Sequence, residues 1–334
     1  MKILRKILFP FSLLYGAITA LRNFLYDKSI KKSIGFDIPI IAVGNLSVGG
    51  TGKTPMVEYL IRLLSDSYNL AVLSRGYKRK SKGFYLANPS TKMEEIGDEP
   101  FQYHIKFKNI RVAVHANRVE GVQTIMQLHP ETELVVLDDA FQHRKIKAGF
   151  YIMLTAYDDL FYNDCVLPAG NLREPKWGVS RADVVVVTKC PTDLSVTEMN
   201  QIRGRIKIDK QKIFFSYINY HHSVTNIVTD IPLENLKTDF IAVAGIAKPQ
   251  YFFDRLKIAN ENCMTFPDHH AFTQKDIQQI LNKAAGKKII TTEKDYMRLQ
   301  NLLPQDQLFY LPIQINFIDR EHAFIEYCTK LSEI

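Results

Sequence analysis

A glycine-rich loop between two apolar segments constrains the fold of this chain more than any other feature. Residues 44–55 read GNLSVGGTGKTP, directly after the apolar run IPIIAV and before the amphipathic stretch MVEYLIRLL. A continuous apolar run is typical of a strand buried on both faces, and apolar residues spaced by three and four predict a helix. The segment therefore predicts a strand, a phosphate-sized loop and a helix in succession, which is the layout of a P-loop.

The residues of this loop suit the binding of nucleotide phosphates. The loop ends in the Gly-Lys-Thr of the P-loop motif, whereas Ser47 stands at the position of the motif's first glycine. Glycines elsewhere in the loop supply the unusual backbone angles that direct N–H groups at phosphate oxygens. We expect Lys53 to reach the β- and γ-phosphates of ATP and the Thr54 hydroxyl to ligate Mg²⁺. The expected nucleotide-binding residues are Gly49, Gly50, Thr51, Gly52, Lys53 and Thr54.

Two adjacent acids indicate where the metal ion would bind. The run ELVVLDD places Asp138 and Asp139 at the end of a second apolar segment. Open α/β sheets bind ligands at the carboxyl ends of their strands, and neighbouring carboxylates repel each other unless a cation lies nearby. We expect these two residues to lie near Mg²⁺, although one of them could instead cap the following helix.

Apolar runs alternate with amphipathic stretches along most of the chain. From residue 34 to 190 the runs are continuous, which predicts an α/β doubly wound, mostly parallel sheet of the P-loop NTPase type. A second series starts with KIFFSY and predicts a smaller α/β domain at 191–334 that closes over the active site. The boundary is expected at TKCPTDLS, where Pro and small polar residues interrupt the periodicity.

The N-terminal segment, residues 1–33, combines most of the net charge with an apolar run. Seven basic residues and one acidic residue give this segment a charge of +6, out of +8 for the whole chain. The uncharged run at 7–21 is short for a spanning helix, which needs roughly 20 residues, and Pro10 interrupts it. We expect a membrane-associated helix held on anionic lipid, with Phe9, Phe11, Leu13, Leu14, Tyr15, Ile18 and Leu21 facing the acyl chains. The alternative is a helix packed on the protein's own core.

Further acidic and histidine residues are candidates for acid/base chemistry. GDEP places Asp98 in a turn bounded by Gly and Pro, which would also suit an ordinary surface turn. FPDHHAF places Asp268, His269 and His270 between aromatic residues in the second domain. Adjacent histidines can bind a metal, but no cluster of other ligands accompanies them and the four cysteines form no CxxC pair. An acid/base or orienting role is therefore favoured for the histidines.

Two loops carry basic residues that could contact substrate phosphate. SRGYKRK contains Arg75 and Lys78, and LPAGNLREP contains Arg173. Both segments could equally be solvated loops.

The order of these motifs resembles the tetraacyldisaccharide 4'-kinases of lipid A biosynthesis. GNLSVGGTGKTP, LSRGYKRK, GDEP, LDDAFQHR, LPAGNLREP, SRADVVVVTK, FPDHHAF and TTEKD occur in that family's order between residues 44 and 295. The resemblance implies transfer of the γ-phosphoryl of ATP to the 4'-hydroxyl of a membrane-resident tetraacylated glucosamine disaccharide 1-phosphate. It also implies a location at the cytoplasmic face of the bacterial inner membrane.

The same resemblance assigns roles to several residues. Lys53 is implied in catalysis, Asp98 as the base that accepts the sugar proton, and His269 as the residue that orients this base. Glu174, in the REP stretch, is implied at the metal site. Because Asp98 and His269 fall in different predicted domains, closure of the domains on substrate would assemble the pair.

An alternative function of another class is a membrane-recruited P-loop ATPase switch. Such a switch would explain the loop and the N-terminal helix, but it gives no reason for the FPDHHAF segment. The chain has no NKxD guanine-reading motif; its nearest stretches are TKCPTD and TEKD. A nucleic-acid partner is disfavoured because the cations gather beside an apolar segment rather than among exposed aromatic residues.

Overall fold

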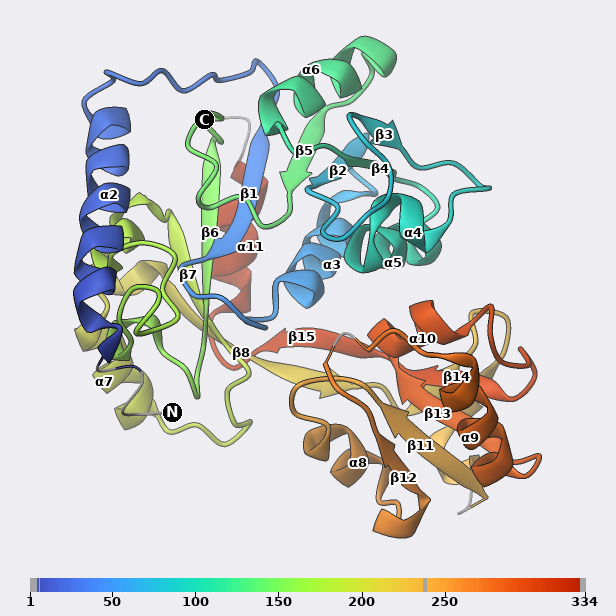
Figure 1. The fold of residues 1–334 in the computed structure, drawn as a ribbon. Coiled ribbons are helices and arrows are strands. Elements are labelled where there is room, and N and C mark those ends of the chain that lie inside the picture. The colour runs from blue at the N-terminus through green and yellow to red at the C-terminus, as the bar shows by residue number, and fades with distance from the viewer. Residues whose placement is uncertain (1–4, 6, 237–238, 269, 331–334) are drawn as a thin grey trace.

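Two α/β units make up the chain, and a basic N-terminal helix lies against the first (Figure 1). The computed structural model describes residues 5, 7–236, 239–268 and 270–330. The α-helices are α2 (Phe9–Asp27), α3 (Lys53–Leu64), α4 (Met93–Ile96), α5 (Asp98–Lys106), α6 (Arg118–Leu128), α7 (Val196–Arg205), α8 (Gln250–Leu256), α9 (Gln274–Ala284), α10 (Glu293–Leu299) and α11 (Glu321–Thr329).

The strands fall into two sheets. Those of the first sheet are β1 (Ile40–Asn45), β2 (Leu70–Ser74), β3 (Tyr85–Leu86), β4 (Arg111–Val114), β5 (Leu134–Leu137), β6 (Phe150–Ala156), β7 (Val184–Thr188), β8 (Ile213–Tyr220) and β15 (Ile313–Phe317). Those of the second sheet are β9 (Ser223–Thr225), β10 (Asp230–Pro232), β11 (Phe240–Ala244), β12 (Cys263–Thr265), β13 (Lys288–Thr292) and β14 (Leu308–Leu311).

The first sheet confirms the predicted α/β fold. Its strand order is β15-β8-β7-β6-β1-β5-β2-β4-β3, and its pairs are parallel apart from the two antiparallel edge strands β3 and β15. Every residue of β1, β2, β5 and β7 is buried, as their continuous apolar sequences predict. The chain leaves β1 toward β2 on one side and leaves β6 toward β7 on the other. The glycine-rich loop after β1 therefore lies at a topological switch point, where open α/β sheets bind ligands.

The predicted domain boundary at residue 190 is wrong. β8 pairs in parallel with β7 of the first sheet, and near the C-terminus β15 pairs with β8. Phe324 and Cys328 of α11 then pack into the same core as Met56 and Leu60 of α3. Pro and polar residues interrupt the periodicity at TKCPTDLS because that segment is the loop into α7, not a linker between domains.

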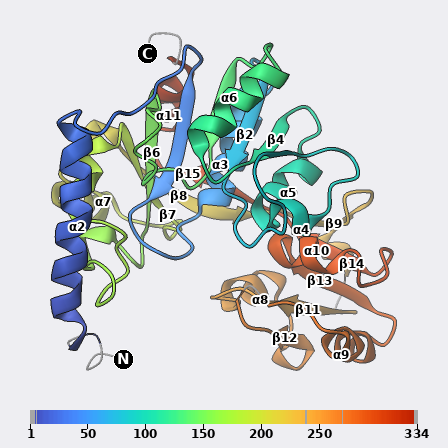
Figure 2. The same ribbon diagram turned by 45° about the horizontal axis from the view of Figure 1, so that its top comes forward.

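The second unit is thus an insertion between two strands of the first. Its sheet, ordered β10-β9-β14-β13-β11-β12, is built from residues 223–311. The chain enters along β8 and returns along β15, whose residue Ile313 is the antiparallel partner of Tyr220. Figures 1 and 2 show this two-stranded ribbon reaching across to the second unit, with α10 lying beside α5. The ribbon and the α5–α10 contact together fix how the two units face each other.

Helix α2 packs with its polar side inward. Ser12, Thr19 and Asn23 are its buried residues, and Ser12 Oγ accepts a hydrogen bond from Ala169 N at 2.8 Å. Its large apolar side chains are exposed instead: Phe9, Phe11, Leu13, Leu14, Ile18, Leu21 and Phe24. Tyr15 was expected to face the acyl chains with these residues, but its hydroxyl points to the protein instead and donates to the Arg173 carbonyl at 3.1 Å.

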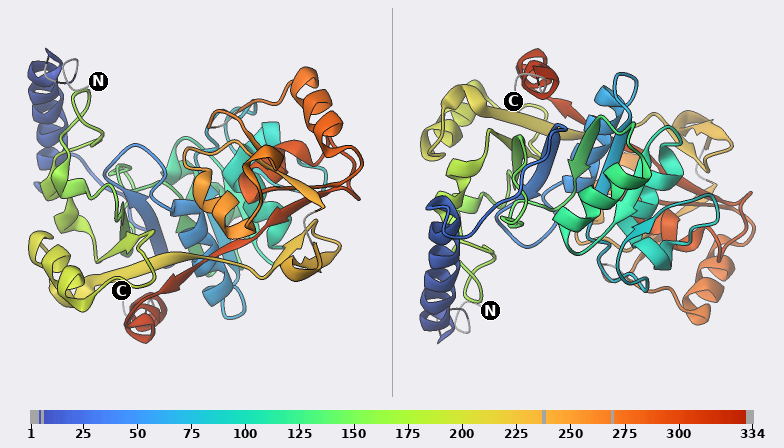
Figure 3. Two further views of the ribbon diagram at one scale, coloured as in Figure 1. Left: turned by 90° about the horizontal axis from the view of Figure 1, so that it is seen from below. Right: turned by 90° about the horizontal axis from the view of Figure 1, so that it is seen from above.

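The alternative of a helix packed on the protein's own core is therefore wrong for this apolar face. Figure 3 shows α2 at the side of the first unit opposite the second unit. Among the residues that the structure describes, no helix has both the length and the hydropathy needed to cross a membrane.

Candidate active site

The glycine-rich loop joins β1 to α3 in the way its sequence predicts. Gly49 has φ of 117° and Gly52, the residue before α3, has φ of 85°, a backbone region that favours glycine. Ser47, at the position of the motif's first glycine, has no positive φ, so a side chain is tolerated there. The loop is also held from outside, because Lys189 Nζ donates to the Gly50 carbonyl at 2.6 Å. The loop is thereby fixed at the positive N-terminus of α3, where a helix binds anions.

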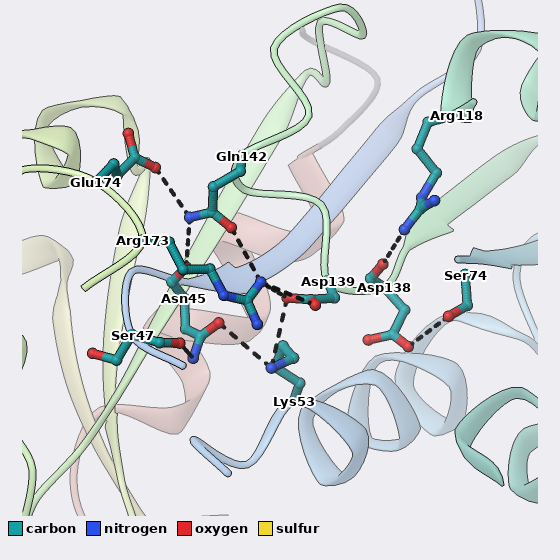
Figure 4. A network of polar contacts seen from close by, with 10 residues as sticks. All are labelled: Asn45, Ser47, Lys53, Ser74, Arg118, Asp138, Asp139, Gln142, Arg173 and Glu174. Atoms are coloured by element: carbon teal, nitrogen blue, oxygen red, sulfur yellow. Dashed lines mark hydrogen bonds and ion pairs between the residues drawn. The ribbon is translucent and has the colours of Figure 1, made fainter. Parts of the chain in front are cut away.

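Lys53 lies between the loop and the acidic pair (Figure 4). Its Nζ is 3.4 Å from Asn45 Oδ1 and 3.6 Å from Asp139 Oδ1. Arg173 Nη1 also donates to Asp139, at 3.1 Å from each carboxylate oxygen. Burial raises the pKa of Asp139, but the charges of Lys53 and Arg173 outweigh it and hold that pKa below its ordinary value. Asp139 is therefore an ionised group that anchors two cations beside the loop.

Asp138 is buried completely, and no cationic side chain among the described residues forms an ion pair with its carboxylate. Its Oδ2 accepts from Ser74 Oγ at 3.1 Å, while Oδ1 has no hydrogen-bond partner among the described residues. Burial, followed by the charges of Glu99 and Asp139, raises the pKa of Asp138 to about 7. An acid kept this dry and unpaired is unfavourable in the charged form unless a cation binds it. Asp138 thus combines complete burial, a raised pKa and an oxygen that lacks a hydrogen-bond partner among the described residues.

Glu174 does not join this group. It is 1% exposed, and its oxygens accept hydrogen bonds from Asn23 at 2.5 Å, Gln142 at 3.0 Å and Arg181 at 2.8 Å. Figure 4 shows Gln142 lying between Glu174 and Arg173. Glu174 therefore ties helix α2 to the loops around it, and its expected place at the metal stays a prediction.

The GDEP turn opens helix α5 next to the acidic pair. Gly97 has φ of 91°, and a Cβ atom there would lie 2.8 Å from the Tyr77 carbonyl oxygen, so glycine is required. Asp98 follows as the first residue of α5, and its Oδ2 accepts hydrogen bonds from Nε, at 3.0 Å, and Nη2 of Arg298 in α10. The charge of Glu99, the second residue of α5, contributes to the raised pKa of Asp138.

Of the two adjacent histidines, His269 lies outside the described residues. His270 stacks on Phe266, with ring centroids 5.1 Å apart, and its Nε2 is 3.0 Å from Asp276 Oδ2. These contacts give His270 a structural role at the start of α9.

The three basic residues that were predicted to contact substrate phosphate lie in different surroundings. Arg75 and Lys78 are exposed in the loop after β2, and Lys78 lies over the Tyr77 ring. Arg173 forms an ion pair with Asp139, so it lies with Lys53 beside the acidic pair.

The sequence alone missed several residues that line the site. Arg118 is 2% exposed and donates to the Asp138 carbonyl at 3.2 Å. Burial and the charge of Arg118 lower the pKa of His143 to about 4. The LDDAFQHR motif contains His143, so motif membership could have singled it out. Lys189, the last residue of the SRADVVVVTK motif, could have been found in the same way, whereas no comparable signal marked Arg118 or Arg298.

Comparison with known proteins identifies the family. The family model described as Tetraacyldisaccharide-1-P 4'-kinase matches residues 4–331. A tetraacyldisaccharide 4'-kinase of Flavobacterium johnsoniae is 54% identical over 326 residues, which cover 97% of this chain and 96% of the relative. One from Bacteroides thetaiotaomicron is 42% identical over 345 residues, covering 95% and 90%.

A solved structure agrees in fold. The crystal structure of LpxK from Aquifex aeolicus in complex with ATP is 32% identical, with a TM-score of 0.79, and the match covers 98% of this chain and 99% of that one. The resemblance drawn from the ordered motifs is confirmed, and the alternative of a P-loop switch is not supported. With a P-loop, an acidic pair after β5 and this similarity over its whole length, the chain belongs to the tetraacyldisaccharide 4'-kinases, the ATP-dependent kinases of lipid A biosynthesis.

Proposed function

We propose that the chain phosphorylates the 4'-hydroxyl of a tetraacylated glucosamine disaccharide 1-phosphate at an anionic membrane surface, using ATP with Mg²⁺. The observation that carries the proposal is the arrangement of Lys53 between the P-loop and Asp139, next to Asp138, whose Oδ1 has no hydrogen-bond partner among the described residues. A site of this kind holds the transferring phosphoryl group by positioning and charge.

The residues present fit a magnesium ion. The unpartnered Oδ1 of Asp138 is a hard oxygen ligand inside the protein, and Thr54 lies one residue after Lys53 at the start of α3. No group of three His, Cys, Asp or Glu side chains gathers among the described residues, which agrees with a P-loop site where a hydroxyl, one acid and phosphate oxygens share the ion. When bound, Mg²⁺ would neutralise negative charge on the phosphates. Asp138 would hold it, and Asp139 would keep Lys53 and Arg173 in place.

Asp98 is the proposed base. A sugar hydroxyl is a poor nucleophile, and a carboxylate within hydrogen-bond reach accepts its proton as the new P–O bond forms. Asp98 stands at the N-terminus of α5, on the side of the first unit that faces α10. His269 is proposed to orient it, on the strength of its place in FPDHHAF.

Membrane association is proposed from helix α2. Its exposed apolar side chains would enter the acyl boundary, while Arg5, Lys28 and Lys31 would meet anionic head groups. Since ATP is cytosolic, this docking would place the enzyme on the cytoplasmic face of the inner membrane and bring the lipid's head group to the site.

The test is phosphate transfer from labelled ATP to the tetraacyl disaccharide 1-phosphate in detergent micelles, with and without Mg²⁺. We expect a product phosphorylated at the 4' position, and rates reduced at least about 100-fold in Lys53→Ala and Asp98→Asn. Lys210→Ala, an exposed lysine on the first unit, is the matched control and should behave as wild type. Activity without a divalent ion, or full activity of Asp98→Asn, would contradict the metal and base assignments respectively.

A further inference from the structure

The proposed base is held by a side chain from the other unit. Asp98 belongs to α5 of the first unit, and the guanidinium that contacts its Oδ2 belongs to Arg298 of α10 in the second. Arg298 is buried, with 7% of its side chain exposed, whereas 27% of the Asp98 side chain is exposed. A buried arginine thus reaches across the interface to an acid that is partly open to the site (Figure 2 shows α10 beside α5).

Arg298 is itself fixed from behind. Its Nη1 donates to Asp295 Oδ1 at 3.3 Å. Asp295 is completely buried, and its Oδ2 accepts from Gly245 N at 2.8 Å and from Thr292 Oγ1 at 2.7 Å. A Cβ atom on Gly245 would approach Asp295 Oδ1 to 3.0 Å, which shows how closely this acid packs on the end of β11. The contacts therefore run without a break from the second sheet, through Asp295 and Arg298, to Asp98.

The opposite end of α5 is tied to the same helix. Lys106 Nζ donates to Glu293 Oε1 at 2.8 Å, and Gln102 Nε2 donates to Glu293 Oε2 at 3.0 Å. With Arg298 at one end of α5 and Glu293 at the other, α10 has little freedom to slide along α5. The position of Arg298 relative to Asp98 is set by the docking of the whole second unit.

We propose that Arg298 is a positioning residue for phosphoryl transfer, which holds the Asp98 carboxylate in the orientation needed to accept the proton of the sugar hydroxyl. This inference rests on the proposed function, in which Asp98 is the base. An arginine fork that binds one oxygen through two N–H groups restricts rotation of the carboxylate. Lysine, a point charge on a flexible stem, supplies the charge without the restriction. An ordinary salt bridge between the units would instead affect only stability.

The experiment compares Arg298→Ala, Arg298→Lys, Asp98→Asn and the double variant Asp98→Asn with Arg298→Ala. We expect Arg298→Ala to lower kcat about 10- to 100-fold with the KM for ATP within about twofold of wild type, because a small misplacement of a reacting group has this effect. Arg298→Lys should recover part of the loss. Added guanidinium ion at millimolar concentration should raise the rate of Arg298→Ala, and equal sodium chloride should not.

The double variant decides whether Arg298 acts through Asp98. If it does, the double variant is no slower than Asp98→Asn alone, since the two residues then act as one unit. If the losses of kcat in the two single variants multiply in the double variant, the inference is overturned. It is also overturned if Arg298→Ala has an unchanged kcat and only a lowered unfolding temperature. If Arg298→Ala fails to fold, Arg298→Lys carries the same comparison.

A matched control variant separates the effect of removing any buried, ion-paired arginine from the loss of the proposed positioning role. Arg203 of α7 pairs with Asp319 at 2.5 Å and is 11% exposed, so Arg203→Ala should lower stability without the selective fall in kcat. If the proposed function itself is wrong, the result differs: Asp98→Asn would then keep its activity, both with and without the Arg298→Ala substitution.

Discussion

Glu58 and Glu293 come from different units and share the same two donors. Gln102 Nε2 lies 2.8 Å from Glu58 Oε1 and 3.0 Å from Glu293 Oε2, and Lys106 Nζ lies 2.6 Å and 2.8 Å from their other oxygens. Both acids are almost fully buried, at 1% and 4% exposure. Glu58 also accepts from Arg62 Nη2 at 2.9 Å, whereas the cation that contacts Glu293 is Lys106, which Glu293 shares with Glu58. Burial, followed by the charge of Glu58, raises the pKa of Glu293 to about 7.

This cluster predicts a pH dependence of stability that Glu293→Gln removes. A group whose pKa is higher in the folded protein binds its proton more tightly there, so its stabilising effect is complete below the unfolded value, about 4.5, and is lost as the pH rises through about 7. We expect the stability of wild type relative to Glu293→Gln to fall by about 1–3 kcal/mol between pH 5 and pH 8. Urea unfolding at both pH values measures it. A difference independent of pH would show that Glu293 stays ionised throughout.

Asp138→Asn should gain stability while it loses activity. The pKa of Asp138 is also raised to about 7, so at pH 8 the folded apo protein holds an unfavourable buried charge, and the amide removes it. We expect a higher unfolding temperature than wild type at pH 8 without nucleotide, little difference at pH 5, and a rate reduced at least about 100-fold. Thermal unfolding at the two pH values is the measurement. A variant less stable than wild type at pH 8 would mean that Asp138 is already stabilised by groups other than a cation.

The apolar face of α2 predicts lipid binding that is separable from stability. Leu14→Glu and Ile18→Glu place acids at positions that are 62% and 59% exposed, so the unfolding temperature should stay close to wild type. Flotation with vesicles containing phosphatidylglycerol should fall several-fold for both variants. Val228→Glu, a 90% exposed apolar position on the second unit, is the matched control and should float as wild type does. Equal flotation of all the variants would exclude α2 as the docking surface.

Substrate-dependent closure remains a prediction, although the structure limits how it occurs. The units already touch along α5 and α10, so closure has to tighten segment 266–272 against the first unit rather than bring distant domains together. Nucleotide and lipid together should slow amide exchange at 97–100 and 266–272, with a smaller change for nucleotide alone. Exchange that is unaffected by both ligands would show that the unliganded arrangement is the working one.

The glycine-rich loop, the acidic pair and the parallel sheet could be predicted because each has a local signature. A buried parallel strand reads as a continuous apolar run, and the P-loop needs glycine at fixed positions, so sequence order suffices. The boundary at 190 could not be predicted in this way. β8 and β15 are strand-like in sequence, and nothing in their composition tells which of two sheets they join.

Contacts between residues that lie far apart in sequence could not be predicted either. Glu174 was expected at the metal, yet Asn23, Gln142 and Arg181 bind its oxygens, and these partners lie up to 151 residues away in sequence. Arg298 reaches Asp98 across 200 residues. Pairings of this kind depend on how the second unit docks, which no local pattern encodes.

The insertion of the second unit between β8 and β15 also determines the order in which the two units can fold while the chain is synthesised. Ile315, Phe324 and Cys328 fill the same core as β1 and α3, so that core stays open until the ribosome has made almost the entire chain. The second sheet, by contrast, is contiguous in sequence and can form earlier, before β15, the antiparallel partner of β8, has been made. A chain that ends before residue 313 and has been released from the ribosome should thus carry a finished inserted unit on an unfinished nucleotide-binding unit, whose exposed apolar strands would need a chaperone's protection.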